Sequence, residues 1–147
     1  MFLNGGLNLM TTLRPQPRFP EQDSEPFWEA TKNHDLIYQI CGHCDEIIFY
    51  PRRHCPVCGS SNTSWHKSRG EGTIYTFSVI MQSRNPAFKE LGAYAVAYVD
   101  LDEGFRIMTN IVGVKNPTDE IECGMRVKVR WEDQGAGGVS LPMFELV

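Results

Sequence analysis

Four cysteines occur in two pairs that have the spacing of a metal site: Cys41 and Cys44, then Cys55 and Cys58. Two residues inside each pair allow a tight turn to point both sulfurs at one ion, and two such turns give a closed tetrahedral set. Asp45 and Gly59 follow the pairs, and both tolerate the left-handed conformation that such turns require. The spacing predicts a structural metal site in preference to two chance pairs of core cysteines.

We expect the ion to be zinc. A tetrahedral sulfur site also suits iron, as in a rubredoxin-like centre, but nothing else in the sequence suggests electron transfer. Four thiolates leave no open coordination position, so the ion would stabilise the fold without activating water. A module of about 30 residues depends on such an ion, because structural zinc contributes about 10–16 kcal/mol of apparent binding free energy.

No second group of residues suggests catalysis. The sequence contains no G-x-S-x-G motif, P-loop or dinucleotide-binding fingerprint. Asp100, Asp102 and Glu103 cluster at an expected hairpin, where acids form turns and interact with solvent. Cys123 is most simply a small apolar filler at a strand entry, and a reactive nucleophile is the alternative. We therefore expect the chain not to be an enzyme by itself.

The elements that position the cysteines are expected to be mainly β. Strand-sized segments flank the pairs, so residues 36–69 are predicted to form a rubredoxin-like zinc ribbon. In residues 70–147, residues alternate with period two in four segments: 74–81, 94–99, 105–111 and 126–132. A fifth segment, 139–147, is interrupted by Pro142, which suits an edge strand or a bulge. Five strands suit a closed barrel of the OB type better than a sandwich, which needs about seven.

A short helix is predicted over residues 23–35, with Ser24 as its N-cap and Pro26 in its first turn. Phe27 and Trp28 supply apolar contacts. Their simpler role is to dock the helix onto the rest of the protein. The alternative is contact with a partner, because aromatic side chains often anchor interfaces.

The first 22 residues are predicted to form an extended arm, since residues 11–22 contain three prolines. The native start could be Met1 or Met10. No apolar run approaches the roughly 18 residues needed to cross a bilayer, and the first ten residues lack the features of a signal peptide. We therefore expect a cytoplasmic protein with no membrane span, in a reducing compartment that favours metal binding over disulfides.

The charge distribution disfavours nucleic acid as the main partner. Hydrophobic residues make up 41% and charged residues 22% of the 147-residue chain, which is typical of a globular protein. Residues 70–147 hold seven Lys/Arg and eleven Asp/Glu and so carry the whole net charge of −4. Surfaces that follow a phosphodiester backbone gain affinity from clustered Lys and Arg, which this half lacks.

Several motifs occur in a characteristic order along the chain: Ser24-Glu-Pro-Phe-Trp28, the Cys41–Cys58 ribbon with Phe49-Tyr-Pro-Arg52, Gly72-Thr-Ile-Tyr-Thr-Phe77, Tyr94-Ala-Val-Ala97, Leu101-Asp-Glu-Gly104, Thr109-Asn-Ile-Val-Gly113, Gly124-Met125 and Leu141-Pro-Met-Phe144. This set, over residues 19–147, resembles the zinc-ribbon plus OB-fold family of acyl-CoA-associated proteins, long catalogued as a domain of unknown function. One departure is Asp45, where the family often has glycine.

The resemblance implies a non-catalytic accessory subunit that forms a hetero-oligomer with a thiolase-superfamily enzyme. Relatives accompany thiolases, HMG-CoA synthases, lipid-transfer-protein-like aldolases and some acyltransferases. They scaffold the enzyme and help to hold or channel an acyl-CoA thioester. By this analogy the ribbon and the helix would form contact surface, and the barrel would cover part of the acyl-CoA path.

Four basic residues are candidate contacts for a CoA phosphate or a partner carboxylate: Arg52, Arg53, Arg84 and Lys89. A solvated basic rim is the alternative. Asn110 is expected to bond to backbone inside the barrel.

A single-stranded nucleic-acid-binding OB protein is the alternative function, with Tyr75, Phe77, Tyr94 and Tyr98 as stacking residues. The alternation, however, places these aromatic residues where a barrel core needs bulk. A small enzyme that uses Cys123 as nucleophile is a third hypothesis.

Overall fold

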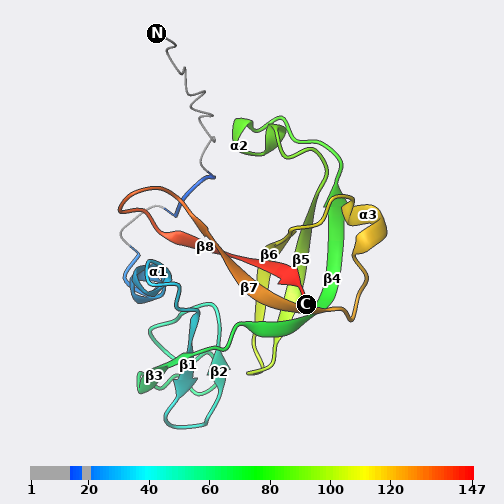
Figure 1. Cartoon of the computed structure of the whole chain (residues 1–147). Coiled ribbons are helices and arrows are strands. Elements are labelled where there is room, and N and C mark those ends of the chain that lie inside the picture. The colour runs from blue at the N-terminus through cyan, green and yellow to red at the C-terminus, as the bar shows by residue number, and fades with distance from the viewer. Residues whose placement is uncertain (1–13, 18–20) are drawn as a thin grey trace.

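The ribbon is a small antiparallel sheet in the order β2-β1-β3, formed by β1 (Ile37–Cys41), β2 (Ile47–Ile48) and β3 (Thr63–Lys67). The protein is represented by a computed structural model that describes residues 14–17 and 21–147 (Figure 1). Most of the predicted arm, including both candidate start residues Met1 and Met10, lies outside the described residues.

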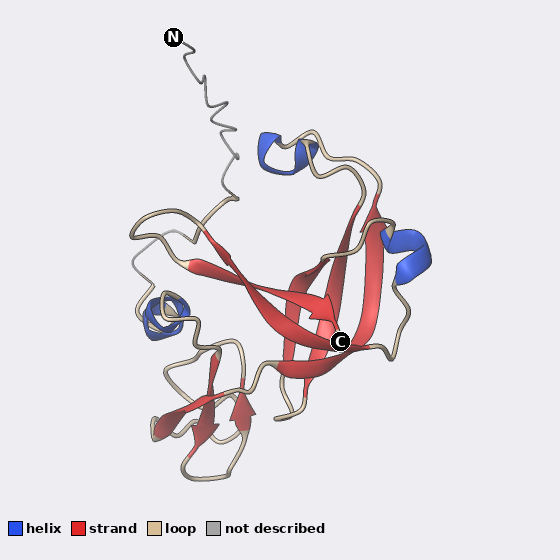
Figure 2. Ribbon diagram, viewed as in Figure 1, coloured by secondary structure: helices blue, strands red, loops and turns tan. Residues whose placement is uncertain are grey.

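Five strands form a closed barrel in the order β4-β5-β6-β8-β7 (Figure 2). They are β4 (Glu71–Ile80), β5 (Tyr94–Leu101), β6 (Arg106–Val112), β7 (Arg126–Asp133) and β8 (Ser140–Leu146). All neighbouring strands are antiparallel except β6 and β8, which pair in parallel at Ile111–Phe144. The predicted mainly-β fold, a zinc ribbon followed by an OB-type barrel, is confirmed.

Two hairpin loops of the barrel contain a glycine with positive φ. Gly104 has a φ of 101° in the hairpin between β5 and β6, and Gly135 has a φ of 93° between β7 and β8. The long loop after β4 contains the four-residue helix α2 (Pro86–Lys89). The link between β6 and β7 contains the four-residue helix α3 (Pro117–Glu120).

Helix α1 (Glu25–Thr31) is shorter than the predicted range of 23–35. Ser24 occupies the predicted N-cap position, but its side chain makes no capping hydrogen bond. Its hydroxyl donates instead to the Glu21 carbonyl at 3.4 Å. The helix ends before His34, which takes a φ of 60° and turns the chain into β1.

Helix, ribbon and barrel share one apolar core. Phe27 of α1 is 4% exposed and packs edge-on against Phe49 of the ribbon, with ring centroids 5.6 Å apart. Phe49 in turn contacts Phe105 of the barrel at 4.7 Å, and Tyr38 of β1 stacks on the same ring at 5.0 Å. The docking role predicted for Phe27 therefore matches its burial.

Two expectations about the barrel interior are wrong. Tyr75 and Tyr98 lie outside the barrel, 55% and 43% exposed. A bulge between Ile74 and Thr76 interrupts the alternation of β4 beside Tyr75, and Tyr98 lies on the face of β5 opposite to buried Ala97 and Val99. Small residues such as Ala97 and Val99 fill the interior in their place. Cys123 is exposed rather than a buried filler, because it lies in the turn that precedes β7.

Within residues 14–17 and 21–147, every helix is too short or too polar to cross a bilayer.

Candidate metal centre and adjoining cleft

The four predicted ligand sulfurs lie together, within 4.8 Å of one another. The sulfurs of Cys41 and Cys58 are 3.6 Å apart, and those of Cys44 and Cys55 are 3.7 Å apart. A tetrahedral ion with zinc–sulfur bonds of 2.3 Å needs sulfurs separated by about 3.8 Å. The cysteines therefore form a zinc-ribbon site whose geometry fits a structural ion.

The two turns that carry the sulfurs have the predicted left-handed residues. Asp45 has a φ of 60° and donates its N–H to the Cys41 carbonyl at 3.0 Å. Gly59 has a φ of 75° and makes the matching bond to the Cys55 carbonyl at 2.9 Å. The two pairs are thus held by equivalent turns.

The electrostatics of the sulfurs favour a bound cation. Backbone N–H groups of His43 and Cys44 lower the pKa of Cys41 to about 6. The pKa of Cys44 rises to about 12, because the lowering by the Glu46 N–H is outweighed by burial and by the neighbouring thiols, with Cys58 the largest of them. One thiolate forms readily while its crowded neighbours resist ionisation, a conflict that a divalent ion resolves.

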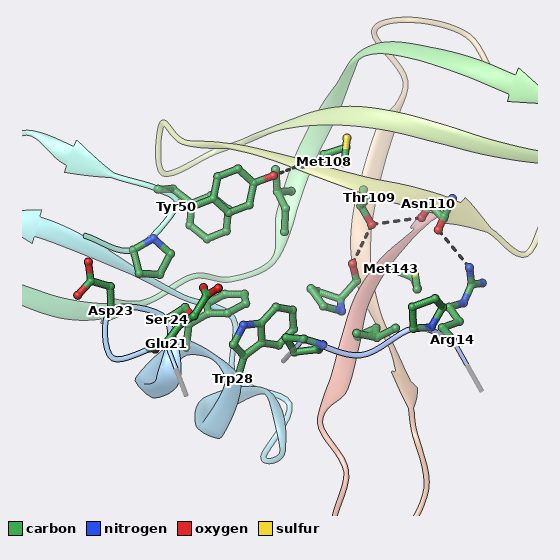
Figure 3. A pocket seen from close by; sticks show the side chains of 18 of the residues that line it. Arg14, Glu21, Asp23, Ser24, Trp28, Tyr50, Met108, Thr109, Asn110 and Met143 are labelled. Atoms are coloured by element: carbon green, nitrogen blue, oxygen red, sulfur yellow. Dashed lines mark hydrogen bonds between the residues drawn. The ribbon is translucent and has the colours of Figure 1, made fainter. Parts of the chain in front are cut away.

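A cleft of about 740 Å³ opens where α1, the ribbon and the barrel meet (Figure 3). Most of its wall is apolar. It is formed by side chains from α1, the segment after β2, β6 and β8, including Phe27, Trp28, Phe49, Tyr50, Ile107, Met108, Leu141, Pro142 and Met143. Such a cleft, apolar with a few polar groups, has the character of a ligand site.

The polar groups of the barrel wall are largely committed to the fold. The N–H of Met108 donates to the Tyr50 hydroxyl at 3.2 Å, and the Thr109 hydroxyl donates to the Pro142 carbonyl at 2.7 Å. Asn110 donates to the Ala95 carbonyl at 2.9 Å, which confirms its expected bond to barrel backbone. These bonds fix the shape of the wall.

The structure separates the basic residues predicted to contact a ligand. Arg52 lines the cleft, and its backbone N–H is held by the Gln39 side chain at 2.8 Å. Arg53, Arg84 and Lys89 are exposed but do not line it. The predicted contact role of all four remains a prediction, and only that of Arg52 has a cleft beside it.

The two aromatic residues of α1 differ in how far they are buried. Phe27 and Trp28 both line the cleft, with their rings 5.0 Å apart in an edge-on arrangement. Phe27 is buried, whereas Trp28 is half-buried and presents its ring to the open space. Partner or ligand contact by these residues remains a prediction.

Sequence reasoning missed Arg14, which lies at one end of the cleft. Its side chain is 9% exposed and pairs with Glu132 of β7. An arginine in a proline-rich arm carries no sequence signal for this role, because its partner lies 118 positions away.

Two groups resemble parts of a catalytic triad but lack its geometry. The Ser140 hydroxyl and His34 Nε2 both contact Oδ1 of Asp133, at 2.6 and 2.7 Å. The serine therefore donates its hydroxyl hydrogen to the aspartate and not, as a triad would require, to the histidine. Ser64 bonds to His66 at 2.9 Å on the exposed ribbon strand. Neither group lines the cleft.

Two family models match consecutive parts of the chain. Residues 28–64 match the model described as "ChsH2, rubredoxin-like zinc ribbon domain", and residues 65–132 match "ChsH2, C-terminal OB-fold domain". The boundary between the two models falls within β3.

Similar proteins agree with these models. A "DUF35 domain-containing scaffold protein" of Methanothermobacter thermautotrophicus is 31% identical, over 74% of this chain and 82% of the relative. A "probable enoyl-CoA hydratase alpha subunit" of Thermomonospora curvata is 36% identical over 90% of this chain, which spans 40% of that relative's length. A chain in the solved "Ltp2-ChsH2(DUF35) aldolase" has a TM-score of 0.78 and 34% identity, covering 89% of this chain and 98% of that one.

Proposed function

The chain belongs to the DUF35 family of zinc-ribbon and OB-fold proteins, and on this basis we propose that it is a non-catalytic scaffold subunit of a thiolase-superfamily enzyme. Relatives that it covers over most of their length are named scaffold proteins, and a solved relative belongs to an aldolase assembly with Ltp2. The expected partner is a thiolase-like subunit, and the expected assembly is a hetero-oligomer in the cytoplasm.

The cleft is the observation that carries this proposal. It lies where all three parts of the protein meet, and no group with catalytic geometry lines it within the described chain. The zinc-ribbon site has four sulfur ligands and no open position, so zinc would hold the ribbon wall of the cleft without joining a reaction. The chain thus supplies a shaped surface, and the chemistry would come from the partner.

We further propose that the cleft holds part of an acyl-CoA thioester. Its apolar wall suits an acyl or pantetheine chain, and Arg52 at its rim suits a phosphate. The name of the Thermomonospora relative supports CoA thioesters as the substrate class.

Co-purification tests the scaffold role. The tagged protein, expressed in its native host and isolated under mild conditions, should bring down a thiolase-fold subunit in a fixed molar ratio. Recovery of the protein only as a lone monomer that binds no CoA ester would count against the proposal.

Substitution of Arg52 tests the ligand role. Arg52→Ala should weaken binding of palmitoyl-CoA by about tenfold, the loss expected for one charge-assisted hydrogen bond. Isothermal titration of the complex measures this change. The matched control is Arg69→Ala, because Arg69 is an exposed arginine outside the cleft. Equal losses in both variants, or none in either, would remove Arg52 from the site.

A further inference from the structure

Residues 14–17, here called the arm segment, run along one side of the cleft, and Pro15 and Pro17 line it directly. Arg14 anchors this segment to the barrel. Its Nε donates to Oε1 of Glu132 at 2.5 Å and its Nη2 donates to Oε2 at 3.1 Å, so the pair is bidentate. The planar guanidinium suits this two-point contact, which the single ammonium of lysine does not reproduce.

Further contacts fix both the side chain and the backbone of Arg14. Its Nη1 donates to Oδ1 of Asn110 at 3.2 Å (Figure 3), and its guanidinium lies 5.2 Å from the ring centroid of Phe88. Its backbone N–H donates to Gln134 at 3.1 Å. Gln16 adds a longer bond, 3.4 Å, to the carbonyl of Gln134.

These partners all belong to the barrel: Asn110 lies on β6, Glu132 on β7, Gln134 directly after β7, and Phe88 on α2. Arg14 makes most of the polar contacts of the arm segment, and Pro15 and Pro17 have no N–H to donate. The wall that the arm segment gives to the cleft therefore depends on this one side chain.

We propose that Arg14 is a positioning residue that holds the arm segment as a wall of the cleft, so that ligand binding is coupled to formation of the Arg14–Glu132 pair. When the pair breaks, the arm segment loses its anchor and Glu132 loses its bidentate partner. A ligand that contacts Pro15 and Pro17 binds more tightly when the wall is in place, and by linkage it stabilises the pair.

The position of the arm segment is tested without ligand. A nitroxide is attached at Gln16→Cys in a Cys123→Ser background, while zinc holds the four ribbon thiols. Its spectrum should show restricted motion with Arg14 intact, fast motion in Arg14→Ala and in Glu132→Gln, and intermediate motion in Arg14→Lys. Arg130→Ala is the control. Arg130 lies on β7, as Glu132 does, and its pair with Glu145 lies outside this cleft. Equal mobility with and without Arg14 would overturn the proposal.

The consequence for binding rests on the proposed acyl-CoA role. Arg14→Ala should weaken palmitoyl-CoA binding by about fivefold, whereas Arg130→Ala should not change it. Equal affinity of the intact protein and Arg14→Ala would also overturn the proposal. If the intact protein binds no palmitoyl-CoA while the nitroxide still responds to Arg14, the acyl-CoA role fails and the positioning role of Arg14 stands.

Discussion

Single side chains in the ribbon carry the stability of a module that has little core of its own. The buried residues around the sulfurs form a separate small cluster, Cys41, Ile48 and Cys55. So few apolar residues cannot stabilise a sheet whose middle strand has five residues and one of whose neighbours has two. We expect a bound ion, together with the aromatic core that the ribbon shares with α1 and the barrel, to supply the remaining stability.

Removal of one sulfur should therefore unfold the ribbon. Cys44→Ser is expected to abolish stoichiometric zinc binding and to cost several kcal/mol of unfolding free energy, since structural zinc contributes about 10–16 kcal/mol in isolated modules. Metal analysis and chemical denaturation measure the two effects. Cys123→Ser is the control, because Cys123 is exposed and outside the sulfur cluster. Full zinc content in folded Cys44→Ser would contradict the assignment.

The ion pair between Asp102 and Arg126 should give stability a defined pH dependence. The bidentate bond from Arg126 lowers the pKa of Asp102 in the folded protein. Asp102 therefore stabilises the fold above the unfolded pKa of about 3.9, and this contribution is lost as the pH falls through the lower folded pKa. The stability difference between the intact protein and Asp102→Asn should be constant near neutrality and shrink below about pH 4.

Urea denaturation at a series of pH values measures that difference. Asp102 is not one of the four cysteine ligands, so we expect both proteins to lose zinc alike in acid and the comparison to isolate the carboxylate. A difference that grows on acidification would contradict the assigned sign. Asp119→Asn on α3 serves as a control, because Asp119 lies in an exposed turn away from Arg126.

Side-chain roles were predictable from sequence where they are local. The metal site was predictable from the cysteine spacing, because each ligand-bearing turn is formed by residues close together in the sequence. The anchoring of Arg14 depends on Glu132 and Asn110, which only the closed barrel brings near it. The exposure of Cys123 could not be predicted from the sequence either, because it depends on the position of the turn before β7.

Helix α1 joins the ribbon to the barrel and supplies one wall of the cleft. Phe27 and Thr31 are the buried residues of this helix, and the Phe27 ring packs against Trp28 on the same helix and Phe49 of the ribbon. The helix has only seven residues and no side-chain cap, so packing must hold it in place.

Phe27→Ala should lower the free energy of unfolding by about 3–5 kcal/mol, the usual cost of emptying a buried phenylalanine site. Chemical denaturation of the zinc-loaded protein measures the loss. Glu29→Ala, on the exposed side of the same helix, should change stability by no more than about 0.5 kcal/mol. Similar effects of both substitutions would mean that α1 does not depend on Phe27 for its position.

The strands of the barrel were largely predictable, because alternation of apolar residues reports which side faces the core. The side of the sheet on which Tyr75 lies was not predictable, because no residue type in β4 indicates the bulge after Ile74. Helix α1 was placed correctly but made too long, because the positive φ of His34 is unusual for a residue other than glycine.

At the scale of the whole molecule, the three parts of the described chain meet at the cleft, and the proposed scaffold role rests on this arrangement. The four cysteines form the zinc-ribbon site, a shared aromatic core joins the ribbon to the barrel, and the cleft lies at their junction. The order of motifs along the chain identified the family, but the cleft could not be predicted, since its walls come from residues as far apart as Arg14 and Met143.

An assay of carbon–carbon bond formation or cleavage on acyl-CoA thioesters tests the proposed scaffold role most directly. It should be run with the purified zinc-loaded chain alone, with its co-purified thiolase-fold partner, and with the two recombined. The account predicts turnover only when the partner is present. Turnover by the zinc-loaded chain alone, free of any other subunit, would contradict it.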